Sequence, residues 1–373
     1  MHSRIMTLQH RMLAQAAALV AVSVLAAAQS SRPDAPVPPA FVIPLWAFPS
    51  TSPPYVTPKP PFDSIQRLQL KHSRESFSRA QVMDRFAPPD WFPATHPPAP
   101  TVVARGRRPS VLACGYCHLL DGRGRPENAV LAGLPVEYFM RQVADMRSGA
   151  RRSAVADWLP WVTMHATALA ATDSEVSVAA HYFARIRATR RYRVVERSQI
   201  PHTYQALGLY ARTGEKGTET LGTRIIEIAD DIERHDLRDA RETFTAYVPL
   251  GSIARGKRIA TVVGGNPVVA CATCHGPTLR GAGAIPPLAG RSPSYLLRQL
   301  IAFRTGARAA ETSAPMQVVV SHLGIDDMIA AVAYAGSLPP LTPSCRASRS
   351  CTASLCEGGR VKSPDASRVL IPI

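Results

Sequence analysis

Cys271-Ala272-Thr273-Cys274-His275 is the stretch that decides how this chain folds, and residues 114–118 repeat it as Cys-Gly-Tyr-Cys-His. This spacing is typical of c-type haem attachment, because on one helical turn both thiols can add to the vinyl groups of one haem while the adjacent imidazole faces the iron. A thioredoxin-like dithiol needs no such histidine, and structural zinc sites usually use other spacings. We therefore expect two covalently attached haem c groups. The expected attachment residues are Cys114, Cys117, Cys271 and Cys274, and the expected proximal ligands are His118 and His275.

The two motifs lie in matching surroundings. At an offset of 157, positions 131–151 and 288–308 share ten identities in 21 positions. In the first copy these are Leu131, Ala132, Gly133, Tyr138, Arg141, Gln142, Arg147, Gly149, Ala150 and Arg151. Such self-similarity at a fixed offset indicates an internal repeat of two domains with one fold.

The repeat also selects the sixth iron ligands. Toward the end of each copy the offset is 152, which pairs Met164 with Met316. His165 and His322 are rival candidates, but they do not align with each other. A lone methionine is more often packing material, whereas a methionine at the same place in both copies fits His/Met ligation of haem iron. We predict Met164 and Met316 as the distal ligands.

The N-terminus predicts export. Residues 1–28 carry Arg4 and Arg11, then an uncharged run from Met12 to Ala28 that ends in small residues. This pattern is typical of a cleaved signal peptide, and the alternative is an uncleaved N-terminal membrane anchor. The mature protein is expected in a bacterial periplasm or outside the cell.

The chain is strongly basic, with a formal net charge of +16. Outside the cytoplasm, such a charge steers a protein toward acidic partner surfaces or anionic lipid headgroups. The compartment and the lack of a basic platform interleaved with aromatic residues argue against nucleic acid. We expect redox proteins with acidic docking surfaces as partners, with association to a membrane complex as a further option; the oligomeric state is left open.

The rest of the chain divides by composition. The expected parts are a proline-rich arm at 29–99, a first domain at 100–187, a connector at 188–251, a second domain at 252–340 and a disordered tail at 341–373. In the arm, prolines disfavour long helices, residues 64–85 could form one short helix, and Trp91 and Phe92 are expected to pack on the first domain. The tail holds three cysteines to which we assign no function.

Periodicity and capping residues predict a mainly α fold, with helices at 135–147, 174–187, 252–263 and 326–335 and one that begins after Ser292 and ends before Gly306. Five extra residues in the first copy, between Arg151 and Met164, are expected to form a loop. The connector reads as irregular, with candidate strands at 224–228 and 244–248. It starts with a basic run, Arg187, Arg190, Arg191 and Arg193, which is either a solvated surface or a docking patch.

The order of motif, glycine-rich loop, Leu-Ala-Gly, Tyr-x-x-Arg-Gln helix, methionine and closing helix resembles class I cytochrome c, and two such domains in tandem resemble the diheme cytochromes c of bacterial respiratory chains. The resemblance covers residues 100–186 and 252–340. In that family a proline before Leu-Ala-Gly supplies a carbonyl to the proximal histidine ring. The second domain keeps Pro286-Pro287, but the first has Ala129-Val130, and Leu119 replaces the glycine that follows the motif, so we expect His118 to be held differently.

His/Met ligation saturates the iron and suits one-electron transfer. The leading interpretation is therefore a periplasmic diheme cytochrome that carries electrons between respiratory or dehydrogenase partners, as a separate carrier or as an electron-transfer subunit, and the sequence leaves open whether it is an enzyme. The alternative is a diheme peroxidase-like oxidoreductase, with one haem, most naturally that of the altered first domain, open to substrate.

Overall fold

The computed structural model describes residues 41–50, 65–263 and 269–340. The described helices and strands all belong to one compact unit. The predicted signal peptide at 1–28, much of the proline-rich arm and the tail at 341–373 lie outside the described residues.

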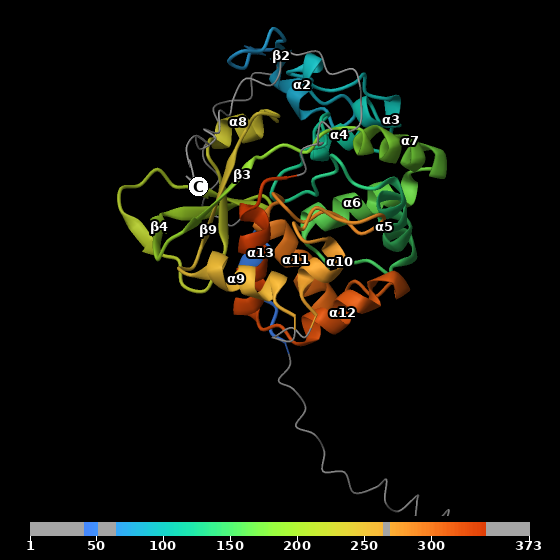
Figure 1. Ribbon diagram of the computed structural model, residues 1–373. Helices are drawn as coiled ribbons and strands as arrows, with labels where there is room; N and C mark the ends of the chain where they lie inside the picture. Colours follow the sequence, from blue (N-terminus) through green and yellow to red (C-terminus); the bar gives the residue numbers. More distant parts are fainter. Residues whose placement is uncertain (1–40, 51–64, 264–268, 341–373) are drawn as a thin grey trace, which may run out of the picture. The chain divides into compact units, whose positions relative to one another are not determined.

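The helices of the first domain, labelled in Figure 1, pack around an apolar core. They are α3 (Thr101–Ala104), α4 (Cys114–His118), α5 (Val136–Ser148), α6 (Leu159–Ala170) and α7 (Asp173–Ala184). Gly149 follows α5 with a φ of 78°, the left-handed conformation in which glycine commonly ends a helix, as its position predicted. Because α6 begins at Leu159, the predicted loop after Arg151 is short and Met164 lies on a helix.

The second domain repeats this arrangement with longer first and last helices. Its elements are α9 (Ser252–Thr261), α10 (Cys271–His275), α11 (Pro293–Arg304), the 3-10 turn η3 (Glu311–Ser313), α12 (Ala314–Ser321) and α13 (Ile325–Ser337). Ser292 Oγ accepts a hydrogen bond from Tyr295 N (3.0 Å) and caps α11, as predicted. Helices α9 and α13 cross so closely that a Cβ on Gly256 would lie 1.9 Å from the Ala330 carbonyl oxygen.

The described residues contain no single helix that is long and apolar enough to cross a bilayer. The bent pair Glu311–Ser321 and Ile325–Ser337, at 114° to each other, reaches that length and composition only together.

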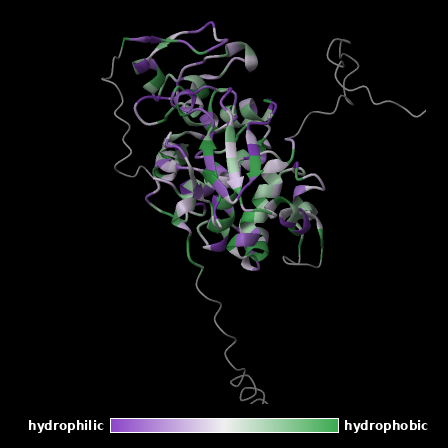
Figure 2. Cartoon of the chain, turned by 90° about the vertical axis from the view of Figure 1, so that its left-hand side faces the viewer, coloured by the Kyte–Doolittle hydropathy of each residue, from purple (hydrophilic) through white to green (hydrophobic). Residues whose placement is uncertain are grey.

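The connector is a folded layer and contains more strands than the sequence indicated. Its elements are β3 (Tyr192–Glu196), β4 (Gln199–Pro201), β5 (Thr203–Ala206), β6 (Leu209–Arg212), β7 (Thr218–Thr220), β8 (Ile226–Ala229), α8 (Ile232–Asp236) and β9 (Phe244–Val248). One mixed sheet has the order β3-β9-β8-β6-β5, and β4 pairs with β7 as a separate ribbon. Every residue of β8 and β9 is buried, and strands of the sheet carry the hydrophobic colour in Figure 2. The two predicted strands are thus confirmed as the centre of a sheet.

This sheet contacts both domains. Tyr192, Leu209, Ala229 and Phe244 belong to the apolar core of the first domain. From the other domain, α13 packs against β3 and α11 against β8. The connector therefore contains β-structure, as its candidate strands suggested, but it is not irregular, because burial on both sides makes this segment a structural layer.

The described part of the arm wraps around the first domain and the connector. It contains η1 (Leu45–Ala47), β1 (Arg67–Leu68), β2 (Phe77–Ser78), α2 (Arg79–Met83) and η2 (Pro93–Thr95), so the helix predicted for 64–85 is limited to five residues. Trp91 and Phe92 line a small cavity together with Gly115, Leu119 and Leu120, which agrees with the prediction that they pack on the first domain. Trp91 joins a small cluster with Leu70, Val82 and the connector residue Leu237, and its Nε1 donates to the Leu237 carbonyl (2.7 Å).

The two domains pair through the same segment of each repeat. Arg151 and Arg308 form an antiparallel β-bridge, flanked by hydrogen bonds from Arg152 N to Ala307 O (2.7 Å) and from Ala309 N to Ala150 O (2.8 Å). The repeated Gly-Ala-Arg segments thus meet with approximate two-fold symmetry. The segment that is identical in the two copies is therefore also the segment through which the two domains contact each other.

Glu227 on β8 ties the connector to the second domain. Its Oε2 accepts hydrogen bonds from Ser292 Oγ (2.9 Å) and Ser294 N (2.9 Å) at the N-terminus of α11. The residue is only 1% exposed, and this burial raises the pKa of its carboxyl above the ordinary value of 4.5. The native state therefore holds this proton to a higher pH than the unfolded chain does.

We expect Glu227→Gln to remove a pH dependence of stability. Above about pH 4.5 the native state binds more protons than the unfolded state, so the wild-type free energy of unfolding falls as the pH rises through the native pKa. Glutamine keeps an acceptor oxygen for the two serines but cannot ionise. Denaturant unfolding of both proteins should be measured at a series of pH values. Over this interval, the free energy of unfolding of the variant should rise relative to that of the wild type. A difference that stays constant with pH would contradict the expectation.

Candidate haem sites

Each Cys-x-x-Cys-His stretch forms a short helix, and a backbone carbonyl oxygen fixes the orientation of its histidine side chain. His118 Nδ1 donates to Ala129 O (2.8 Å) in the first domain, and His275 Nδ1 donates to Pro286 O (2.9 Å) in the second. Burial lowers the pKa of His118 to about 4 and also lowers that of His275. Both imidazoles are therefore neutral near pH 7, with Nε2 directed away from the carbonyl and able to bind iron.

The expectation that His118 is held differently was wrong. The acceptor is a backbone carbonyl, which Ala129 supplies as well as a proline does. Leu119 adopts φ 63° and ψ 156°, close to the φ 80° and ψ 157° of Gly276. This region is strongly unfavourable for any residue with a Cβ, so the first domain keeps the backbone path at the cost of strain at Leu119.

A cavity of about 610 Å³ lies beside His118. Both cysteines of the first motif line it, as does Met164, and its volume is within the range usual for cofactor sites. The donor set of two thiols, one neutral imidazole and a thioether fits a covalent haem with both axial positions filled.

The cavity also separates the two candidates for the sixth ligand in the first domain. Met164 lines it, whereas His165, the next residue on α6, stacks on Trp161 with ring centroids 5.0 Å apart and is not among the lining residues. In the second domain, Met316 is partly buried on α12, while His322 is exposed after the last turn of that helix. These positions agree with the choice of methionine that the repeat suggested.

A cluster of polar side chains borders the cavity where the domains pair. Arg151 donates to Gln142 Oε1 (2.9 Å), Tyr295 OH (3.2 Å) and Gln299 Oε1 (3.3 Å), and these four residues all line the cavity. Arg308 donates to the same two glutamine oxygens from the other repeat. These acceptors are uncharged, so they do not neutralise the guanidinium charge of Arg151 beside the cavity.

No role was predicted for this cluster, although its members are identities of the repeat: the tyrosines, glutamines and arginines at 138 and 295, 142 and 299, and 151 and 308. Polar residues that recur in both copies were a signal for a shared polar site. Haem carries two propionate carboxylates, and a cationic cluster at the border of the cavity fits them.

No protein-family model matches the chain. It is 27% identical over 232 residues to a thiosulfate dehydrogenase electron acceptor of Stutzerimonas stutzeri, which covers 61% of this chain and 80% of that protein. The corresponding protein of Thiomonas intermedia is 25% identical over 243 residues, or 64% and 84% of the two chains. The chain is a diheme class I cytochrome c. It carries two haem c groups and transfers electrons between redox protein partners, and these relatives give no support to the peroxidase-like alternative.

Similarity to solved structures is partial. The thiosulfate dehydrogenase TsdBA of Marichromatium purpuratum matches 64% of this cytochrome and 39% of its own chain, with 26% identity and a TM-score of 0.42. Cytochrome c4 of Acidithiobacillus ferrooxidans matches 60% of this chain and 98% of its own, with 21% identity and a TM-score of 0.39.

We expect Arg151→Gln to lower a haem reduction potential, because a nearby positive charge disfavours the oxidised, more positive iron. A unit charge at about 10 Å in a medium of dielectric constant about 20 contributes on the order of 70 mV. Spectroelectrochemical titration measures the effect. Arg141→Gln is the matched control, since Arg141 pairs with Glu137 on the outer part of α5 and does not line the cavity. Equal shifts in the two variants would contradict a specific role for Arg151.

Proposed function

We propose that this cytochrome accepts single electrons from a thiosulfate dehydrogenase in the bacterial periplasm, after cleavage of its signal peptide, and passes them to a further redox protein. The observation that carries the proposal is the equivalent fixing of His118 and His275, each neutral and bonded to a carbonyl, in a chain related to two thiosulfate dehydrogenase electron acceptors. Two sites built for saturated iron suit a carrier.

Each domain supplies its own set of ligands in this proposal. In the first domain, Cys114 and Cys117 attach the haem, and His118 and Met164 bind its iron. In the second, Cys271 and Cys274 attach it, and His275 and Met316 bind the iron. Haem c supplies a one-electron change at iron. The histidine and methionine of each domain would bind its iron, and Arg151 places a positive charge beside the cavity of the first domain.

Replacement of each predicted distal methionine is expected to disturb one haem. In each of the variants Met164→Ala and Met316→Ala, loss of the thioether should open one coordination position on one iron. One of the two haems should then gain high-spin character and bind added imidazole. Optical and electron paramagnetic resonance spectra of the oxidised protein measure this change. His165→Ala and His322→Ala are the controls and should leave both spectra unaltered. A histidine variant that produces the high-spin signal would reverse the assignment.

The proposed donor is tested with the purified holoprotein in its oxidised form. Catalytic amounts of thiosulfate dehydrogenase plus thiosulfate should reduce both haems, as seen in the optical spectrum, whereas thiosulfate alone should not. A protein that ascorbate reduces fully but that remains oxidised with enzyme and thiosulfate would be a diheme carrier for a different donor.

A further inference from the structure

We propose that an acidic redox protein docks on the second domain, at the face around Cys274, and that the connector and the arm cover the matching face of the first domain. The proposal rests on the function as an electron carrier, and it adds which haem exchanges electrons with the partner. Electrons would reach the first haem through the second.

The first motif is covered by an arginine of the connector. Tyr116 stands between the two cysteines of the motif in sequence. The Arg238 guanidinium lies 3.5 Å from the centre of the Tyr116 ring, and its Nη1 donates to the Tyr116 carbonyl (2.7 Å). From the same side chain, Nε donates to Val82 O of the arm (3.2 Å). Arg238 is itself buried, so it joins the connector, the motif and the arm in one covered contact.

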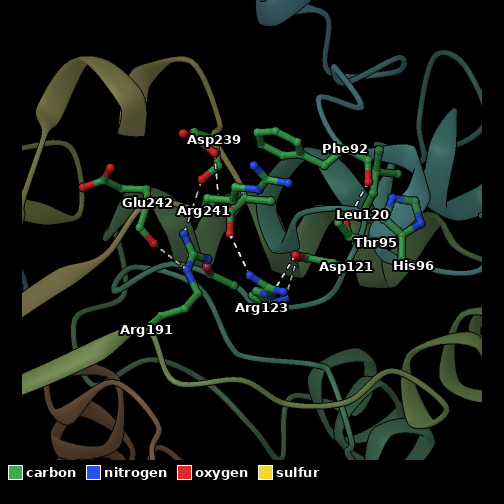
Figure 3. Close-up of polar contacts among 12 residues, drawn as sticks. Phe92, Thr95, His96, Leu120, Asp121, Arg123, Arg191, Asp239, Arg241 and Glu242 are labelled. Carbon is green, nitrogen blue, oxygen red and sulfur yellow. Dashed lines mark hydrogen bonds and ion pairs between the residues drawn. The ribbon is translucent and has the colours of Figure 1, made fainter. Parts of the chain in front are cut away.

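The turn that follows the first motif is covered in the same way (Figure 3). Arg123 donates to the Ala240 carbonyl (3.3 Å), and Arg191 from the start of the sheet donates to Gly124 O (2.6 Å). On the arm side, the guanidinium of Arg241 lies 3.7 Å from the centre of the Phe92 ring. The basic run at 187–193 is therefore partly structural, because Arg191 is buried among carbonyl oxygens.

The second motif presents the same face to solvent. Thr273, Cys274, Pro277 and Thr278 are exposed. Since a thioether would join Cys274 directly to the haem, the haem edge bonded to this cysteine would lie next to the exposed surface. Apolar side chains flank the motif in sequence, and Val262, Val263, Val269 and Ile285 are 52%, 71%, 39% and 37% exposed. Exposed apolar side chains near a haem edge are suited to transient docking.

Charge identifies the kind of partner. Residues 243–310 contain eight lysines and arginines and no aspartate or glutamate, whereas Asp121 and Glu127 closely follow the motif of the first domain. Lys257 and Arg258 are exposed on α9, which packs against α10. The tail at 341–373 has five basic and two acidic residues, so its charge disfavours it as the occupant of this face. Complementarity favours an acidic protein.

The first test uses the double variant Lys257→Glu with Arg258→Glu. The fully reduced protein is mixed at low ionic strength with hexacyanoferrate(III), an anion that takes one electron from each ferrous haem and becomes hexacyanoferrate(II). We expect the second-order rate constant of oxidation to fall about tenfold or more, because steering of an anion by local charge is lost. The control, Arg187→Glu with Arg190→Glu, makes the same change of charge in exposed residues of the basic run and should stay within about twofold of wild type.

A second test shows which haem is exposed. Hexacyanochromate(III), a paramagnetic and redox-inert anion, should broaden the proton resonances of the second haem more than those of the first, with each set assigned through the Met164 and Met316 variants. Equal rates in the two double variants, or stronger broadening of the first haem, would overturn the proposal. Binding to membranes would overturn it as well. This outcome would be charge-dependent binding of the protein to vesicles with one quarter phosphatidylglycerol, lost in the Lys257 and Arg258 variant, since the face would then serve a membrane. Neither rate nor broadening involves thiosulfate dehydrogenase, so failure with that enzyme would leave this inference standing.

Discussion

Buried guanidinium groups that donate to backbone carbonyls hold the separate parts of this cytochrome together. Arg298 on α11 donates to Ala47 O of the arm and Pro126 O of the first domain, and Arg291 donates to Val130 O across the same boundary. Arg238 and Arg191 do the same from the connector. A buried charge without partners is very costly, so each of these contacts is needed once its arginine is enclosed. The fold therefore depends on several segments closing around the same cations.

This constraint also explains why the two copies of one domain differ in how far their haem motifs are covered. The domains pair symmetrically at Arg151 and Arg308, with matching glutamine acceptors. The connector and the arm then add a covering layer to the first motif, through Arg238 and Trp91, while Cys274 stays exposed. Symmetry at the centre brings the two domains into direct contact, and asymmetry at the outer faces distinguishes them.

The haem sites show how little the ligand geometry depends on side-chain identity beyond the ligands themselves. A carbonyl of Ala129 or of Pro286 orients the proximal histidine equally well, because the acceptor belongs to the backbone. Differences between the two haems are thus more reasonably sought in the surroundings: the enclosed cationic cluster near the first, and the solvent at the second. Charge and exposure are both known to set the potential of a haem.

The sequence by itself determined the local chemistry: two haem motifs, their proximal histidines, the repeat, and helix ends such as Ser292 and Gly149. These features depend on residues close together in the chain, where spacing and capping are sufficient. The pairing of Met164 and Met316 also came from sequence, and their positions in the structure agree with it without testing it. Tertiary structure decided what the connector is, because strands pair with residues far away and short runs such as 203–206 have no distinctive pattern. It also decided the role of Arg238 and the exposure of Cys274, since burial depends on which distant segments pack against a residue.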